Sequence, residues 1–143
     1  MATYDEHMTQ AKHNEDVANL LGVPDVYSIS WVTTITFYSA LQYLEAAFCN
    51  TGIGHSETYP NPDKLSLHRF RQDLIDREPR TRDIYTDYTE LRRASETCRY
   101  CKKPYIREKQ AADFLNVNLK NIKDILIRNN LITMEDQKAP AVG

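Results

Sequence analysis

Glycine and proline are scarce in this sequence, whose 143 residues include only four Gly and six Pro. A fold built from many short strands and tight turns needs more of both, so the composition argues against an all-β protein. Three Cys cannot all pair within one chain, which favours a reduced, cytoplasmic setting over a disulfide framework. With 41% hydrophobic and 27% charged residues, the chain is expected to fold around one core.

Long apolar runs are also missing. The most apolar stretch, Trp31–Phe48, contains Gln42, Glu45 and several Thr. This stretch is too polar for a transmembrane helix and is typical of a buried one. The first residues are polar and acidic and do not resemble a secretory signal. The sequence therefore predicts a soluble protein that does not associate with a membrane.

Positive charge is almost absent from the first half of the chain. Residues 1–63 contain one basic residue, Lys12, and carry a net charge of −7, whereas residues 64–143 carry +5. All ten Arg lie at or after Arg69, and eight of them fall between Arg69 and Arg99. Arg presents a planar fork of donors that fits phosphate, so a polyanion-binding face is one interpretation. The other interpretation is a solvated helix face with i,i+4 ion pairs, because acidic residues are interleaved with the arginines.

Helical periodicity predicts five helices joined by short connections. The second is apolar almost all round, as expected for a helix that is buried or shared with a partner. The predicted helices are Asp5–Leu21, Ser28 or Ser30 to about Cys49, Lys64–Arg77, Pro79 to about Cys101, and Ile106–Arg128, with a loop over Asn50–Asp63. We therefore predict an all-α protein, a four- to five-helix up-down bundle that forms one domain over residues 1–134, with a flexible tail at 135–143.

Familiar catalytic and metal-binding motifs are missing. The sequence has no GxGxxG, phosphate-loop or HExxH motif. Cys98-x-x-Cys101 has no second cysteine pair at zinc-finger spacing, so no metal site and no cofactor are predicted. His7 and His13 lie on a polar helix and are expected at the surface. Residues 110–131 resemble a helix-turn-helix only weakly, and one continuous last helix is the simpler interpretation.

Polar residues share one face of the fourth predicted helix. Tyr88, Ser95 and Arg99 stand at positions i, i+7 and i+11. His68 and Arg71 are likewise neighbours on one face of the third helix. If the two helices are antiparallel neighbours, these side chains converge on one polar patch. The patch can be a site for chemistry or a structural cluster that fixes the register of the helices, and the sequence leaves both open.

The order and spacing of these residues resemble the HEPN superfamily, small helical domains of prokaryotic toxin, defence and nucleotidyltransferase-associated proteins. The resemblance spans roughly residues 7–128, and its single motifs are loose. The matching stretches are Trp31-Val-Thr-Thr-Ile-Thr-Phe37-Tyr38-Ser39-Ala40-Leu41-Gln-Tyr-Leu44-Glu45-Ala46, His68-x-x-Arg71, and Tyr88-x-x-Leu91-x-x-x-Ser95-x-x-x-Arg99-Tyr100. The resemblance implies a HEPN-like helical bundle and, for many members, metal-independent ribonuclease activity at a homodimer interface.

The signature of the ribonuclease members is missing. The resemblance implies an Arg followed, four to six residues later, by a His. Here the last His is His68 and the first Arg is Arg69, so no Arg precedes any His. The standard ribonuclease assignment therefore fails. A rewired site would need His68 as base and Arg71, in reversed order, as phosphate clamp.

Three functions from different classes follow. The favoured one is a non-catalytic HEPN-like module that forms a homodimer through the apolar second helix, Trp31–Phe48. This module binds RNA, a nucleotide or a partner protein in a prokaryotic defence or toxin–antitoxin setting. The next is a structural assembly subunit without nucleic acid. The last is a metal-independent ribonuclease whose catalytic residues are His68, Arg71, Ser95 and Arg99. The residues expected to bind nucleic acid or another ligand are Arg69, Arg71, Arg92, Arg93, Arg99 and Tyr100.

Overall fold

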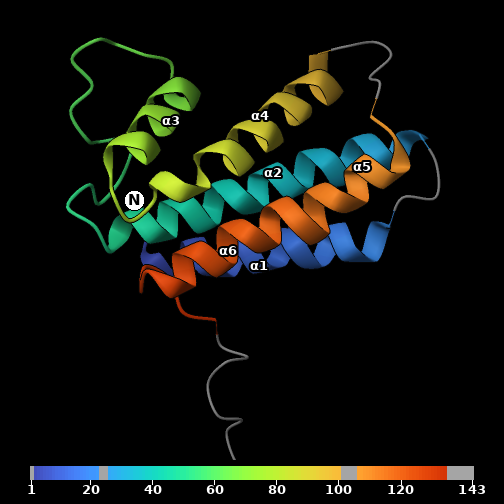
Figure 1. The fold of residues 1–143 in the computed structure, drawn as a ribbon, viewed down its shortest axis with the longest axis horizontal. Helices are drawn as coiled ribbons and strands as arrows, with labels where there is room; N and C mark the ends of the chain where they lie inside the picture. The colour runs from blue at the N-terminus through green and yellow to red at the C-terminus, as the bar shows by residue number, and fades with distance from the viewer. Residues whose placement is uncertain (1, 23–25, 101–105, 135–143) are drawn as a thin grey trace, which may run out of the picture.

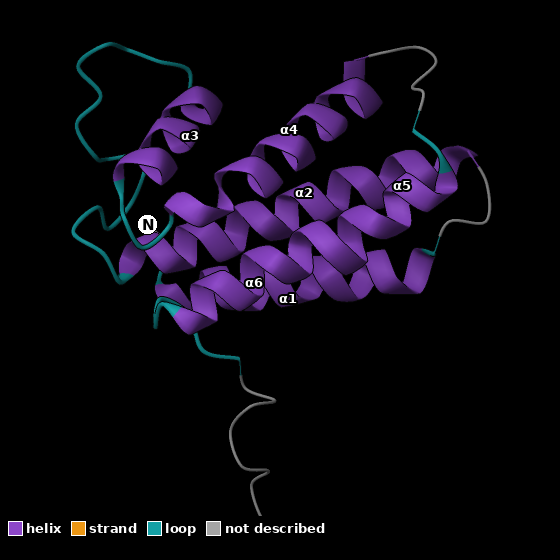
Figure 2. Cartoon of the chain, in the orientation of Figure 1, coloured by secondary structure: helices purple, strands orange, loops and turns teal. Residues whose placement is uncertain are grey.

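A computed structural model describes residues 2–22, 26–100 and 106–134, and within them every regular element is a helix (Figure 2). The prediction of an all-α protein is thereby confirmed. The helices are α1 (Tyr4–Leu21), α2 (Val26–Cys49), α3 (Leu67–Arg77), α4 (Tyr85–Tyr100), α5 (Glu108–Asp113) and α6 (Leu119–Arg128).

The long helices form an antiparallel bundle around α2 (Figure 1). After α1, each of α2, α4 and the rod formed by α5 and α6 runs opposite to the long helix before it. α2 packs against α1, α4, α5 and α6, while the short α3 lies beside α4 at one end of the molecule. The backbones of α2 and α3 do not approach closely, so side chains make the connection between them.

The core follows from the composition of α2. Its large side chains Phe37, Tyr43, Leu44 and Phe48 are fully buried by the other helices of the same chain. A helix that is apolar on every face can therefore be covered within this one chain. Trp31 is the exception, because 63% of its surface is exposed. The homodimer through this helix stays a prediction, and Trp31 is the exposed large apolar side chain that α2 offers it within the described residues.

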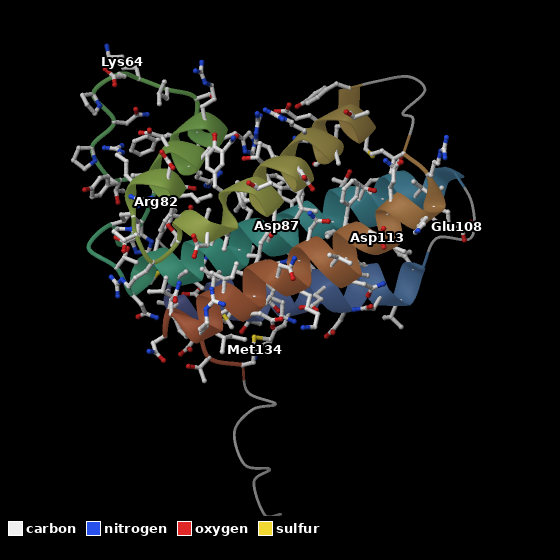
Figure 3. The ribbon with its side chains drawn as sticks, in the orientation of Figure 1. Lys64, Arg82, Asp87, Glu108, Asp113 and Met134 are labelled. Carbon is white, nitrogen blue, oxygen red and sulfur yellow. The ribbon has the colours of Figure 1, made fainter. Side chains whose placement is uncertain are left out.

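Several predicted helix ends are wrong by a few residues, each for a local reason. α2 begins at Val26, before the two serines proposed as its cap. α3 begins after Ser66, whose hydroxyl accepts from the backbone N–H of Arg69. Lys64 has a positive φ of 52° and lies at the outer edge of the preceding loop (Figure 3), so it cannot belong to the helix. Pro79 stands in a turn and not in the first turn of α4, because α4 begins only at Tyr85, after a 3₁₀ turn at Arg82–Ile84.

The last helix is continuous, as predicted, and has no helix-turn-helix break. A π-helical turn at Phe114–Asn118 joins α5 to α6. Within this turn the buried amide of Asn118 donates to Oδ1 of Asp87 at 3.0 Å and to Oε2 of Glu90 at 2.9 Å. The extra residue in the turn thus aims a polar side chain at α4, which carries both carboxylates.

None of the helices in the described ranges has the length and apolar character needed to cross a membrane. The predicted tail at 135–143 lies outside those ranges, and so does Cys101 of the cysteine pair.

Candidate functional site

One histidine and three arginines from two helices come together where α3 passes α4. Burial lowers the pKa of His68 below its usual 6.5, and the positive charges of Arg71, Arg99 and Arg92 lower it further. All three guanidinium groups therefore lie within electrostatic reach of the imidazole. Ser95 lies between Arg92 and Arg99 on the same face of α4. We refer to His68, Arg71, Arg92, Ser95 and Arg99 as the polar cluster.

His68 is packed into this position by an aromatic side chain of α2. Its ring centroid lies 5.8 Å from that of Phe37, which also contacts Tyr88 at 5.6 Å. The Nδ1 atom of His68 is buried and has no hydrogen-bond partner among the described residues. A neutral imidazole with an unpaired nitrogen can accept a proton from a bound group.

Arg71 is held away from such a role by a buried ion pair. Its Nε donates to Oε1 of Glu45 at 2.9 Å and to Oγ of Ser56 at 3.3 Å, and only 6% of the residue is exposed. Ser56 also donates to the same Glu45 oxygen. Because Glu45 already compensates its charge, Arg71 ties α3 to α2 and is poorly placed as a direct phosphate ligand. Sequence reasoning overlooked Glu45, although an acidic residue inside an otherwise apolar helix is a signal for such a partner.

Arg99 differs from Arg71 because no carboxylate in the described part of the chain pairs with it. Its Nη1 donates to the hydroxyl of Tyr38 at 2.8 Å. Its guanidinium lies 5.6 Å from the ring centroid of Tyr38 and 5.1 Å from that of Tyr100. Tyr38 thus joins the predicted site residues, and the contacts leave the charge of Arg99 uncompensated.

The polar cluster and the neighbouring Gln72 and Tyr88 contain six buried polar atoms with no protein partner among the described residues. Buried polar groups are nearly always hydrogen-bonded, so such a group indicates a bound water, ion or ligand. The unpaired atoms on α3 and α4 are His68 Nδ1, Gln72 Oε1, Tyr88 OH, Arg92 Nε, Ser95 Oγ and Arg99 Nε. A cluster whose only role is to fix helix register is expected to satisfy its own donors, and this one does not.

The other predicted ligand-binding residues lie at the margin of the cluster. Arg69 is exposed and lines, together with Arg92, a cavity of about 290 Å³ between α3 and α4. Asp73 also lines this cavity but pairs with Arg77 at 2.7 Å. Arg93 and Tyr100 are exposed on α4, so they can reach a ligand bound at the surface.

The lowered pKa of His68 predicts a pH-dependent stability. The unfolded chain takes up a proton near pH 6.5 that the folded protein resists, so the free energy of unfolding should fall as the pH drops from 6.5 through the lowered pKa. Above pH 6.5, His68 contributes no such slope. Urea unfolding of His68→Gln at several pH values on both sides of 6.5 should show a smaller fall in the free energy of unfolding below pH 6.5 than the wild type shows. His13→Gln, at an exposed position on α1, should keep the wild-type profile, and equal slopes in all three proteins would contradict the assignment.

No model of a protein family, no curated protein and no solved structure matches this chain. The comparisons therefore do not test the HEPN resemblance, which stays a prediction.

Proposed function

We propose that this chain is a non-catalytic HEPN-like module that binds RNA through the phosphate backbone at the polar cluster. The observation that carries the proposal is the row of unpaired donor atoms on one face of α4. Arg92 keeps such an atom although its Nη1 pairs with Oε1 of Glu96 at 2.5 Å, and that carboxylate is half-exposed, unlike the buried Glu45 beside Arg71. Arg92 Nε, Ser95 Oγ and Arg99 Nε are buried and have no acceptor in the described part of the chain. Phosphate offers acceptor oxygens and negative charge at once, so it would satisfy all three.

The surroundings of the cluster fit a nucleic acid better than an isolated anion. Arg69 and Arg93 add positive charge beside the buried donors, and Tyr100 exposes an aromatic ring at the end of α4. Exposed aromatic rings stack on unpaired bases, and the stacking tolerates any sequence. RNA in single-stranded form is therefore the expected ligand, ahead of a mononucleotide or a protein partner.

A homodimer in a prokaryotic defence or toxin–antitoxin setting, in the cytoplasm, belongs to the same proposal. The dimer contact would use the end of the bundle where the large apolar side chains Leu20, Leu21 and Trp31 are exposed. Sedimentation of the full chain measures it, and a strict monomer at high concentration would remove this part of the proposal.

RNA binding should depend strongly on Arg92 and Arg99. Fluorescence anisotropy with labelled single-stranded RNA, in EDTA, should show an affinity that rises steeply as salt falls. In the double variant Arg92→Gln/Arg99→Gln the affinity should drop by about 10–100-fold. The slope of log K against log salt should shrink by about 1.4, because two phosphate contacts of about 0.7 each are lost.

The matched control is Arg80→Gln/Arg128→Gln, which removes the same charge at exposed positions outside the cluster. Equal losses in both double variants would mean that net charge, not the polar cluster, binds the RNA. No binding even at low salt would contradict the proposal and favour the structural assembly subunit.

The same experiment tests a metal-independent ribonuclease, which one specific observation favours. His68 has an unpaired ring nitrogen and a lowered pKa, so it is neutral at neutral pH and available as a base beside two arginines. Cleavage of the RNA in EDTA that disappears in His68→Ala would replace the non-catalytic proposal with this one. Cleavage that persists in His68→Ala would remove His68 from any mechanism.

A further inference from the structure

A second group of reactive side chains lies on the other side of the Glu45–Arg71 pair. His7 of α1, Cys49 at the end of α2 and His55 of the following loop each offer one ligand atom, and the three atoms lie within 4.8 Å of one another. The start of α1 lies beside the end of α2 (Figure 1), which brings these three segments together. His7, predicted as a plain surface residue, is in fact half-buried.

The orientation of His7 is set by a second residue of α2. Its Nδ1 lies 2.7 Å from Oε1 of Gln42, an amide oxygen that can only accept. Nδ1 therefore carries the proton, and the lone pair of Nε2 is free to bind a cation. Histidines that ligate metals nearly always donate their other ring N–H in this way, which fixes the tautomer and the direction of the ring.

The loop that carries His55 is held in place before any ligand arrives. Gly54, at a φ of +72°, donates its N–H to the carbonyl of Phe48 at 2.9 Å, which folds the loop back onto the end of α2. The next residue after His55, Ser56, is anchored on the buried carboxylate of Glu45. The ring of His55 then lies 6.2 Å from that of His7, centroid to centroid.

The electrostatic surroundings favour a cation. His7 and His55 line a cavity of about 710 Å³, whose other lining residues include Asp5, Glu6 and Glu57. These five residues belong to the half of the chain that carries a net charge of −7. Arg71 also lines the cavity, but its charge is paired with the buried carboxylate of Glu45. The cavity also leaves room for a further ligand beside the two histidines.

We propose that His7, Cys49 and His55 form a Zn²⁺ site with three protein ligands and a fourth position that opens into this cavity. Two imidazoles and a thiolate are a donor set that zinc prefers, and three protein ligands with one open position are typical of sites where zinc contacts a water or substrate. Ligand atoms around tetrahedral zinc stand about 3.3–3.7 Å apart, so the three atoms need to close by at most about 1.5 Å. Binding would release the thiol proton of Cys49.

The proposal is tested with Zn²⁺ and Co²⁺ on the full chain without an affinity tag. Titration should give one equivalent of bound Zn²⁺, and the Co²⁺ complex should show a thiolate charge-transfer band that Cys49→Ser removes. His7→Ala and His55→Ala should abolish binding at the concentrations that saturate the wild type. Gln42→Ala, which leaves all three ligands in place, should weaken Zn²⁺ binding by about 10–100-fold.

Matched controls come from the same residue types elsewhere in the chain. His13→Ala on α1 and Cys98→Ser on α4 should leave Zn²⁺ affinity and the Co²⁺ spectrum unchanged.

Absence of Zn²⁺ binding by the wild type, or a Co²⁺ spectrum that Cys49→Ser does not alter, would overturn the proposal. Because RNA binding is measured in EDTA, its outcome and the outcome of the zinc titration are independent. If a ligand variant loses its helical circular dichroism, the test rests on Gln42→Ala, which replaces no ligand and removes only the hydrogen bond to His7.

Discussion

Replacing Arg71 by Ala is expected to lower the free energy of unfolding by about 3–5 kcal/mol, because the variant leaves the carboxylate of Glu45 buried and uncompensated. Both side chains of the pair are almost wholly buried, and Nε of Arg71 lies 2.9 Å from Oε1 of Glu45. The pair also links α2 to α3 through side chains, so its loss should loosen α3 as well. Urea unfolding followed by circular dichroism measures the change.

Two comparisons separate the buried charge from the loss of contacts. The double variant Glu45→Gln/Arg71→Met removes both charges and keeps most of the volume, so it should be clearly more stable than Arg71→Ala. Arg77→Ala removes an exposed i,i+4 partner of Asp73 and should cost no more than about 0.5 kcal/mol. If Arg71→Ala lost less than about 1 kcal/mol, the Glu45 carboxylate would be compensated by water or neutralised by protonation. That result would contradict the expectation.

The second large effect is expected at Phe37. Phe37→Ala should lower the free energy of unfolding by about 3–5 kcal/mol, since the ring is fully buried where α2, α3 and α4 meet. The variant also removes the surface against which His68 packs, at 5.8 Å between ring centroids. The imidazole should then become more hydrated, and the loss of stability on acidification described for His68 should become smaller. The same urea series on both sides of pH 6.5 measures both results.

Phe37→Leu provides the conservative control, because it keeps an apolar side chain of similar length and should lose much less stability than Phe37→Ala. Leu67→Ala on α3 removes an exposed apolar side chain and should stay within about 0.5 kcal/mol of the wild type. If Phe37→Ala and Leu67→Ala were equally stable, the position of Phe37 at the centre of this junction would be wrong.

Local patterns in the sequence predicted much of the helical architecture. The all-round apolar character of Trp31–Phe48 identified a buried helix, and α2 is that helix at the centre of the bundle. The 3.6-residue period of residues 106–128 predicted one continuous last helix, and only its π-helical turn was missed. Helix ends were less predictable, because Ser, Pro and Lys near an end permit several starts and tertiary contacts choose between them.

The polar cluster was predictable in part. Spacing along α4 placed Ser95 and Arg99 on one face, and the structure brings His68 and two further arginines to that face. The sequence could not show that Arg71 is neutralised by Glu45, which lies 26 residues earlier. The difference in role between Arg71 and Arg99, one paired with a carboxylate and the other with a tyrosine hydroxyl, arises only from packing.

By itself, the sequence determined the helical class, the central place of α2 and the separation of an acidic from a basic half, because periodicity and composition are properties of neighbouring residues. Only the tertiary structure decided which side chains meet. His7, Cys49 and His55 come from two helices and a loop, and no spacing motif joins them. Their proximity depends on how α1 packs on α2 and on a loop folded back at Gly54, and these long-range distances are set by packing, not by local pattern.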